Sequence, residues 1–195
     1  MLYWSFRFKN PFPFLIRSKA HIFFASNSSL KLSHRLILGN SIKLPRVSTL
    51  PINIWVGNKA QLDIGKAVCI GPGVNLIVKD NARLKIGDSS YFTSDAHIEV
   101  VESLEIGSNC AISWGVSIID SNHHDIYYEN RVSVNKKLQI GDNVWIGCNS
   151  IILPGTVIGS GSTIAAGSVV KGDFPTNSLI AGNPAKVVRE DVSWK

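Results

Sequence analysis

The chain has 195 residues, of which 45% are hydrophobic and 17% charged, a balance that indicates a folded globular protein and excludes a disordered one. Its net charge of +6 is uneven, because residues 1–62 hold nine of the 20 basic residues and none of the 14 acidic ones. No stretch reaches the 18 or so uncharged apolar residues of a membrane-spanning helix, and nothing resembles a nucleic-acid-binding module.

The first predicted unit is a basic aromatic N-terminal segment, residues 1–41. It begins MLYWSFRFKNPFPFLIR, where aromatic and basic residues alternate and two prolines interrupt any helix. One interpretation is a peripheral anchor on anionic lipid, since aromatic rings favour the headgroup level and basic residues are attracted to the surface charge. The other is a segment that packs over one end of the domain with its basic side chains in water.

A period of six residues dominates the chain after residue 42. The large apolar residues that mark this period are Ile64, Ile70, Leu76, Ile86, Phe92, Ile98, Ile106, Ile112, Ile118, Ile140, Ile146, Ile152, Ile158, Ile164 and Val170. A helix, with 3.6 residues per turn, would scatter them around its circumference, whereas short strands joined by tight bends would align them. Residues 42–63 look like an earlier, degenerate coil.

Three sixes make a coil of 18 residues, and stacked coils place each third hexapeptide about 4.8 Å above its predecessor. The coil starts at Ile64, Ile86, Ile106 and Ile140 are separated by 18 residues plus insertions of four, two and 16. The period therefore predicts an all-β, three-sided parallel β-helix over residues 42–190, with residues 191–195 as a C-terminal tail.

The sequence from Ile140 to Glu190 resembles the hexapeptide-repeat acyltransferase family, in particular its maltose, galactoside and polysaccharide O-acetyltransferase branch. Members of that branch end with a segment like AGNPAKVVR, residues 181–189 here. The resemblance covers residues 42–190 and implies a left-handed β-helix, a homotrimer, and acetyl-CoA as co-substrate with no metal and no nucleic-acid partner. It implies an O-acetyltransferase that acts on a sugar hydroxyl in polysaccharide or glycan biosynthesis.

The one large insertion, residues 121–139, carries two adjacent histidines, His123 and His124, in the stretch SIIDSNHHDI. An excursion of this length in a compact fold is typically functional or disordered, and its chemistry favours function. The resemblance places the general base of acetyl transfer at His123, with His124 as the alternative. Imidazole suits this role because it titrates near neutral pH. Asp120 either orients the ring or is an ordinary turn acid that faces solvent.

The resemblance also predicts where the cofactor binds. The pantetheine arm would lie between two neighbouring prisms of the trimer, along small residues, and the nucleotide phosphates would meet basic residues, which could alternatively be a solvated tail. An outward-facing indole, Trp145, would pack at the subunit interface or against the cofactor arm. The other predicted cofactor residues are Cys148, Ala165, Ala166, Gly167, Lys171, Lys186 and Arg189.

Two alternatives keep the same fold: an N-acetyltransferase that acts on an amino sugar nucleotide, and a scaffold without turnover. This chain has Thr93, Ser94 and Asp95 where relatives often carry an acceptor-binding asparagine, and it lacks the helical N-terminal domain of maltose-type enzymes. Both departures favour a glycan under construction as the acceptor. The three cysteines are odd in number and widely spaced, which favours a cytoplasmic protein, peripheral to the inner face of the membrane if the N-terminus binds lipid.

Overall fold

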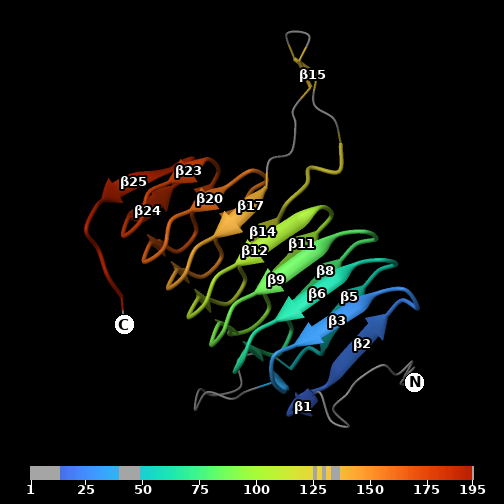
Figure 1. Ribbon diagram of the computed structural model, residues 1–195. Coiled ribbons are helices and arrows are strands. Elements are labelled where there is room, and N and C mark those ends of the chain that lie inside the picture. The colour runs from blue at the N-terminus through green and yellow to red at the C-terminus, as the bar shows by residue number, and fades with distance from the viewer. Residues whose placement is uncertain (1–13, 40–48, 125–126, 129–130, 133–136, 195) are drawn as a thin grey trace.

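The computed structural model describes residues 14–39, 49–124, 127–128, 131–132 and 137–194, and every regular element in these ranges is a β-strand. Figure 1 shows the strands wound into a column from which one loop projects. The chain places one strand in each of three sheets and then returns to the first, so the strand order repeats along the column. This arrangement confirms the all-β parallel helix predicted from the period of six.

Three long sheets, called A, B and C below, form the sides of the column. Sheet A contains, in spatial order, β1 (Phe14–Ile16), β4 (Leu36–Leu38), β7 (Cys69–Ile70), β10 (Tyr91–Phe92), β13 (Ala111–Ile112), β18 (Trp145–Ile146), β21 (Thr163–Ile164), β24 (Leu179–Gly182) and β25 (Ala185–Arg189). Sheet B contains β2 (Ala20–Phe24), β5 (Ile52–Val56), β8 (Asn75–Val78), β11 (His97–Val100), β14 (Ser117–Ile119), β19 (Ile151–Ile152) and β22 (Val169–Val170). Sheet C contains β3 (Ser29–Leu32), β6 (Gln61–Ile64), β9 (Arg83–Ile86), β12 (Ser103–Ile106), β17 (Leu138–Ile140), β20 (Val157–Ile158) and β23 (Asp173–Phe174).

The apolar residues that mark the period of six fill the interior of the column. None of the fifteen is more than 3% exposed. Parallel pairing stacks them in register, so that Ile146 lies beside Ile164 and Ile152 beside Val170. Each such side chain contributes about 1.5–3 kcal/mol when it is fully buried. The core is therefore a set of continuous aliphatic columns, as predicted.

The β-helix begins well before the boundary predicted at residue 42. Parallel pairing joins β1 to β4, β2 to β5 and β3 to β6, so residues 14–38 add a further coil at the N-terminal end. Sequence periodicity does not reveal this coil, because the side chains of its three strands are partly buried or exposed and none is fully buried. Residues 1–13 and 40–41 of the predicted basic aromatic N-terminal segment, residues 1–41, lie outside the described residues.

The predicted loop leaves the column after β14 and rejoins it at β17, which begins at Leu138 (Figure 1). Within it, β15 (Tyr127–Tyr128) and β16 (Arg131–Val132) pair in antiparallel fashion. Residues 125–126, 129–130 and 133–136 lie outside the described residues. In the described part of the chain, no helix has the length and apolar character needed to cross a membrane.

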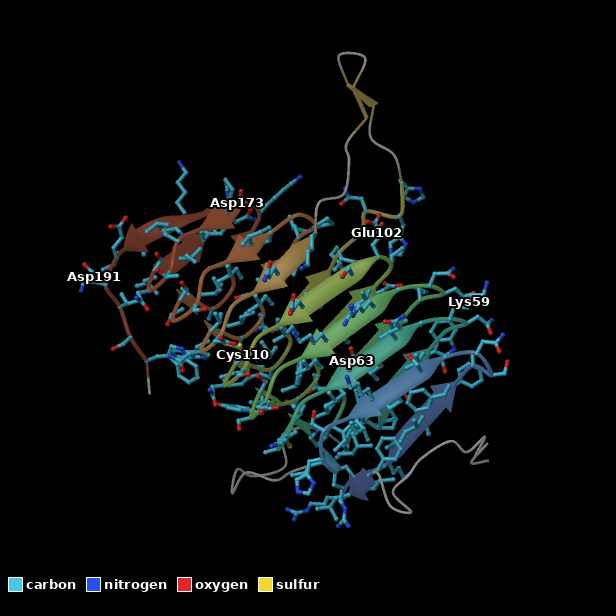
Figure 2. All side chains as sticks on the ribbon, in the orientation of Figure 1. Lys59, Asp63, Glu102, Cys110, Asp173 and Asp191 are labelled. Atoms are coloured by element: carbon cyan, nitrogen blue, oxygen red, sulfur yellow. The ribbon has the colours of Figure 1, made fainter. Side chains whose placement is uncertain are left out.

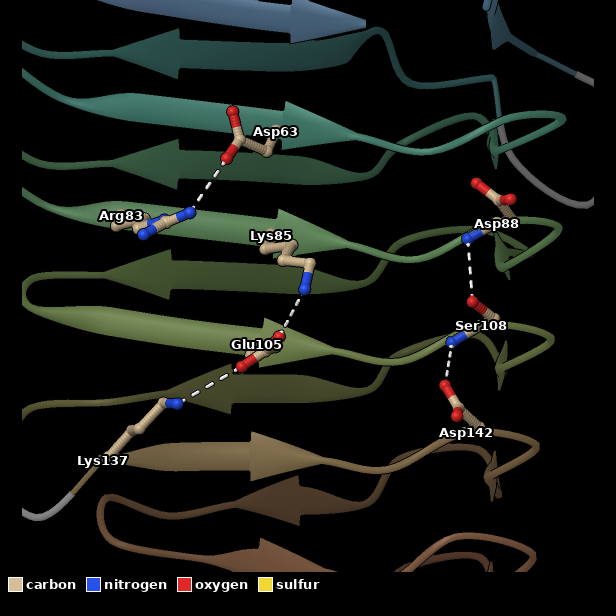
Figure 3. Close-up of polar contacts among 8 residues, drawn as sticks. All are labelled: Asp63, Arg83, Lys85, Asp88, Glu105, Ser108, Lys137 and Asp142. Carbon is tan, nitrogen blue, oxygen red and sulfur yellow. Dashed lines mark hydrogen bonds and ion pairs between the residues drawn. The ribbon is translucent and has the colours of Figure 1, made fainter. Parts of the chain in front are cut away.

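The outer face of sheet C carries ion pairs between successive coils. Arg83 contacts Asp63 at 3.2 Å, and Glu105 lies between Lys85 at 2.7 Å and Lys137 at 3.2 Å (Figure 3). The parallel register sets Lys85 directly beside Glu105, whereas Asp63, whose direct neighbour is Lys85, pairs diagonally with Arg83. Opposite charges on directly neighbouring strands stabilise a sheet modestly.

Candidate active site

Two borders of sheet B matter for the site: the bends where the chain passes from sheet A to sheet B (the A/B edge) and from sheet B to sheet C (the B/C edge). The histidine-bearing loop leaves from the B/C edge, directly after β14. His123 and His124 are exposed, whereas Asp120 and Ser121 before them are buried. The two histidines therefore stand at the point where the buried column becomes an exposed loop.

The backbone of His123 adopts a left-handed conformation, with a φ of 58°. This region is uncommon for a residue with a side chain, and it is stabilised here by the Ser121 hydroxyl, which accepts a hydrogen bond from the His123 amide at 3.1 Å. The His123 imidazole is about half exposed, at 47% of its side-chain surface. A local turn thus fixes the backbone from which an accessible imidazole projects.

Asp120 has neither of the roles considered for it from the sequence. The residue is 2% exposed, and its carboxylate accepts three backbone hydrogen bonds from the coil below, from Val101 at 2.7 Å, Glu102 at 2.9 Å and Ser103 at 2.8 Å. Figure 2 places Glu102 beneath the base of the projecting loop. Asp120 therefore anchors the loop to the B/C edge, because its oxygens satisfy amides that the bend leaves unpaired.

The acid that faces the imidazole is Glu99, on the outer face of β11. Its Oε2 atom lies 3.6 Å from Nε2 of His123 and 3.7 Å from Nε2 of His97, and its Oε1 atom lies 3.1 Å from Nζ of Lys79. Partial burial on its own would raise the pKa of Glu99. The hydrogen bond and charge of Lys79, together with the two imidazoles, outweigh that effect and lower the pKa below 4.5. Glu99 is therefore ionised at neutral pH.

Glu99 was not identified from the sequence, although a signal for it existed. The coils that start at Ile86 and Ile106 are 20 residues apart, and this offset places Glu99 beside Ile119, four residues before His123. The chemistry of the site is shared between two coils, so a search along the chain near the histidines finds acids such as Asp120 and Asp125 but not Glu99.

The small residues predicted to line the cofactor groove come together on the A/B edge. Gly167 donates a backbone hydrogen bond to the carbonyl of Cys148 at 2.9 Å, which stacks the two bends directly. A Cβ atom on Gly147 would lie 2.6 Å from the backbone nitrogen of Ala166, so no side chain fits between these coils. Ala166 and Gly167 are exposed, while Cys148 and Ala165 are partly exposed. The predicted stripe is thus a continuous, open edge with short side chains.

Trp145 faces outward from sheet A, as predicted, and the residue is 42% exposed. Its indole nitrogen donates to the Ser113 hydroxyl at 3.1 Å, and its ring lies 6.2 Å from the ring of Trp194. The Trp194 indole nitrogen donates to the Asn143 carbonyl at 2.8 Å. The C-terminal tail therefore folds back over sheet A, a contact that the sequence did not predict. Packing of Trp145 on a neighbouring subunit or on the cofactor stays a prediction.

The predicted phosphate-binding residues do not form one cluster. Lys186 and Arg189 lie on β25, where Lys186 pairs with Ala181, and Ala181 follows Ile180, whose carbonyl accepts a hydrogen bond from the Ala165 amide. Lys186 is therefore close to the small-residue edge, whereas Arg189 pairs with Leu179 at the other end of β24. Lys171 directly follows β22 and lies on the B/C edge. All three are exposed.

The candidate residues thus divide between two borders of sheet B. The histidines, Glu99 and Lys171 lie toward the B/C edge, and the small residues lie on the A/B edge. The strand between these edges, β14, has three residues, which span roughly 10 Å at about 3.3 Å per residue. Among the residues that the structure describes, no group of three or more His, Cys, Asp and Glu side chains could hold a metal ion.

Comparison with known proteins identifies the family. Residues 137–172 match the family described as "Bacterial transferase hexapeptide (six repeats)". The "Putative lipopolysaccharide biosynthesis O-acetyl transferase WbbJ" of Escherichia coli strain K12 is 31% identical over 147 residues, which are 70% of this chain and 75% of that protein. The structure of a galactoside acetyltransferase in complex with coenzyme A is 28% identical, with a TM-score of 0.52 over 70% of this chain and 66% of that one.

A third similarity concerns the fold alone. The crystal structure of the acetyltransferase NeuO, described as specific for polySia, is 22% identical and covers 88% of this chain and 84% of that one, with a TM-score of 0.60. The three sheets in repeating order are consistent with the left-handed β-helix expected from the resemblance. The chain belongs to the hexapeptide-repeat acetyltransferase family.

Proposed function

We propose that this protein is an O-acetyltransferase that transfers an acetyl group from acetyl-CoA to a sugar hydroxyl during polysaccharide or glycan biosynthesis, with His123 as the general base. The observation that carries the proposal is the accessible imidazole of His123 at the base of the loop, with an ionised carboxylate beside it. An alcohol is a poor nucleophile at neutral pH, and a positioned base typically contributes about 10²–10⁴-fold to the rate.

The names of the relatives support the substrate class. WbbJ is named a "Putative lipopolysaccharide biosynthesis O-acetyl transferase", and the galactoside acetyltransferase was solved with coenzyme A. In this chain, the open small-residue edge at Ala166 and Gly167 offers room for a narrow pantetheine arm. Lys186, near the same edge, and Arg189, farther along the same strand, would attract the nucleotide phosphates.

A homotrimer would bring the two halves of the site together. The histidine edge and the small-residue edge of one chain lie on opposite borders of sheet B, so a cofactor on one edge does not directly adjoin the base on the other. In a ring of three identical chains, the A/B edge of each subunit would face the B/C edge of its neighbour. Each active site would then combine a base from one subunit with a cofactor groove from the next.

From the same proposal we expect the protein to lie in the cytoplasm. Acetyl-CoA is a cytoplasmic co-substrate, and the three free cysteines fit a reducing compartment. The N-terminal end of the column exposes two large apolar residues, Ile16 and Phe23, and two basic residues, Arg17 and Lys19. These side chains would favour peripheral contact with an anionic membrane surface.

The test measures turnover by the purified protein with acetyl-CoA and a panel of free and lipid-linked glycans. The measured signal is the release of the coenzyme A thiol. We expect His123→Ala to lower kcat by about 10²–10⁴-fold. The matched variant His124→Ala should retain most of the activity, and both should keep acetyl-CoA binding in a thermal-shift assay. Full activity of His123→Ala would refute the assignment. Turnover with amino sugar nucleotides alone would identify an N-acetyltransferase, and no thermal shift would identify a scaffold.

A further inference from the structure

We propose, on the basis of the proposed function, that Glu99 is a positioning residue that keeps the proton of His123 on Nε2 and leaves Nδ1 as the atom that accepts the proton of the sugar hydroxyl. The sequence alone did not indicate a positioning role for any residue on β11. The proposal rests on which ring nitrogen of His123 faces the Glu99 carboxylate and on the contacts that hold this carboxylate in place.

The ring orientation is the first argument. Nε2 of His123 is the atom that lies 3.6 Å from Glu99 Oε2. This separation is in the range of an ion pair and is longer than a hydrogen bond, and hydrogen bonds of catalytic groups are often long in ligand-free enzymes and shorten in the substrate complex. In neutral imidazole one nitrogen donates and the other accepts, so a carboxylate at Nε2 favours the tautomer with its lone pair on Nδ1.

The fixed position of the carboxylate is the second argument. Among the residues that the structure describes, three charged or titratable groups face Glu99: Lys79 from the bend directly after β8, His97 from β11 itself, and His123 from the loop after β14. Lys79 binds Oε1 and also lies 5.8 Å from the ring centre of Trp55, so two contacts hold its ammonium group. Because Lys79 occupies Oε1, the other oxygen, Oε2, is directed toward the two imidazoles.

The loop geometry is the third argument. Asp120 and Ser121 fix the chain on the N-terminal side of His123, and the left-handed backbone of His123 directs its side chain back over β11. Glu99 lies on β11 beside Ile119, so it is one coil away from the strand that leads into the histidine. The pair therefore depends on the register of two coils and does not depend on the outer part of the loop.

The proton balance of the reaction is complete with this assignment. Nδ1 accepts the hydroxyl proton as the sugar oxygen forms a bond to the thioester carbonyl carbon. When the tetrahedral intermediate collapses, the carbon–sulfur bond breaks and the coenzyme A thiolate takes the proton back from the imidazolium. Glu99 stays ionised throughout and stabilises the imidazolium through Nε2–H, as the triad acid does in serine hydrolases.

The experiment compares Glu99→Gln with Glu105→Gln. The control removes the same charge from a glutamate on sheet C that is also held by cations. We expect Glu99→Gln to lower kcat by about 10-fold or more with little change in the KM for acetyl-CoA, because an acid that acts through the base contributes to the same step as the base. The acid limb of its pH–rate profile should move to lower pH, since the imidazolium loses a stabilising anion. Glu105→Gln should change neither quantity.

Two further variants make the result decisive. Glu99→Asp keeps the charge and should recover part of the lost activity. In the double variant His123→Ala with Glu99→Gln, the glutamate change should cause no additional loss, because a positioning residue has no effect once its partner is gone. Wild-type kcat in Glu99→Gln, or a further independent loss in the double variant, would overturn the proposal.

These outcomes are distinguishable from failure of the proposed function. If His123→Ala is fully active, the assignment of the base is wrong. If His123→Ala is inactive while Glu99→Gln is normal, only the positioning role is wrong. Thermal unfolding of each variant separates a loss of catalysis from a loss of fold.

Discussion

The outer faces of sheets B and C carry comparable ionic contacts, yet only one of them has the features of a site. On sheet C, Glu105 lies between Lys85 and Lys137, and these contacts lower its pKa, with the hydrogen bond from Lys85 as the largest cause. On sheet B, the pKa of Glu99 is also lowered, but His123 is among its partners. A carboxylate between cations is thus an ordinary product of stacked strands, and it becomes a candidate site where an inserted loop brings an ionisable ring to it.

The two faces also differ in their uncharged residues. On sheet B, the rings of Phe23 and Trp55 stack at 6.0 Å. The Asn53 amide accepts a hydrogen bond at 3.0 Å from His21, in the tautomer with its proton on Nδ1, and donates to Asn75 at 2.7 Å. Sheet C presents alternating acids and bases at corresponding positions (Figure 3). The same parallel register therefore produces different side-chain contacts between neighbouring strands on the two faces.

The largest effect is expected at the B/C edge, which separates these faces. Asp120→Ala removes the acceptor of three amide hydrogen bonds in a buried position, and a hydrogen bond to a charged group contributes about 1.5–3 kcal/mol. We expect the free energy of unfolding in urea to fall by about 3 kcal/mol or more, and activity to fall because His123 is no longer anchored.

Asp142→Ala is the matched control for that prediction. Its carboxylate accepts one amide hydrogen bond, from Ser108 at 2.7 Å, and it is exposed (Figure 3). We expect a loss of about 1 kcal/mol or less. Equal losses for the two variants would show that Asp120 is not a special anchor of the loop.

Substitution of a lysine should have a smaller effect, and this effect should differ between the two faces. Lys79→Met removes a cation from Glu99 and leaves its negative charge less neutralised, so the imidazolium form of His123 becomes more favourable. The acid limb of the pH–rate profile should therefore move to higher pH, by less than about one pH unit, opposite in direction to Glu99→Gln. Lys85→Met should leave the profile unchanged. A shift in both variants would mean that long-range charge, and not the contact with Glu99, controls the base.

The period of six was sufficient to predict the core, because it depends on a simple physical requirement. Each coil must direct one large apolar residue per side inward, and every one of the predicted residues from Ile64 to Val170 is buried. The first coil escaped prediction because residues such as Ile22 and Phe24 lie at the open end of the column, where they are only partly buried and follow a strand period of two.

The candidate site was only partly predictable for a different reason. His123 could be found because the loop that carries it interrupts the period. Glu99 could not be found from local sequence, since it contacts His123 through the pairing of β11 with β14, and a glutamate on a strand looks the same whether it faces a lysine or a histidine. The role of Asp120 could not be predicted, because a carboxylate three residues before a histidine suggests either a catalytic partner or a turn acid, whereas its oxygens bind the backbone of the coil below.

The smallest predicted effect is the contribution of the glutamate on each face to the stability of the fold as the pH falls. The folded-state pKa values of Glu99 and Glu105 lie below 4.5, so each carboxylate stabilises the fold at higher pH, and this contribution is lost as the pH falls through the lowered value. Each contribution should be no more than about 1 kcal/mol, because both groups are partly exposed. Urea unfolding at neutral pH and below pH 4.5 should show that Glu99→Gln reduces the pH dependence of stability more than Glu105→Gln, since the Glu99 side chain is 17% exposed and that of Glu105 29%.

Salt at about 1 M, where the screening length is about 3 Å, should reduce the contribution of Glu105 to stability more than that of Glu99. An equal response of both variants to pH and to salt would mean that the two faces differ only in the imidazole and not in how firmly their carboxylates are held.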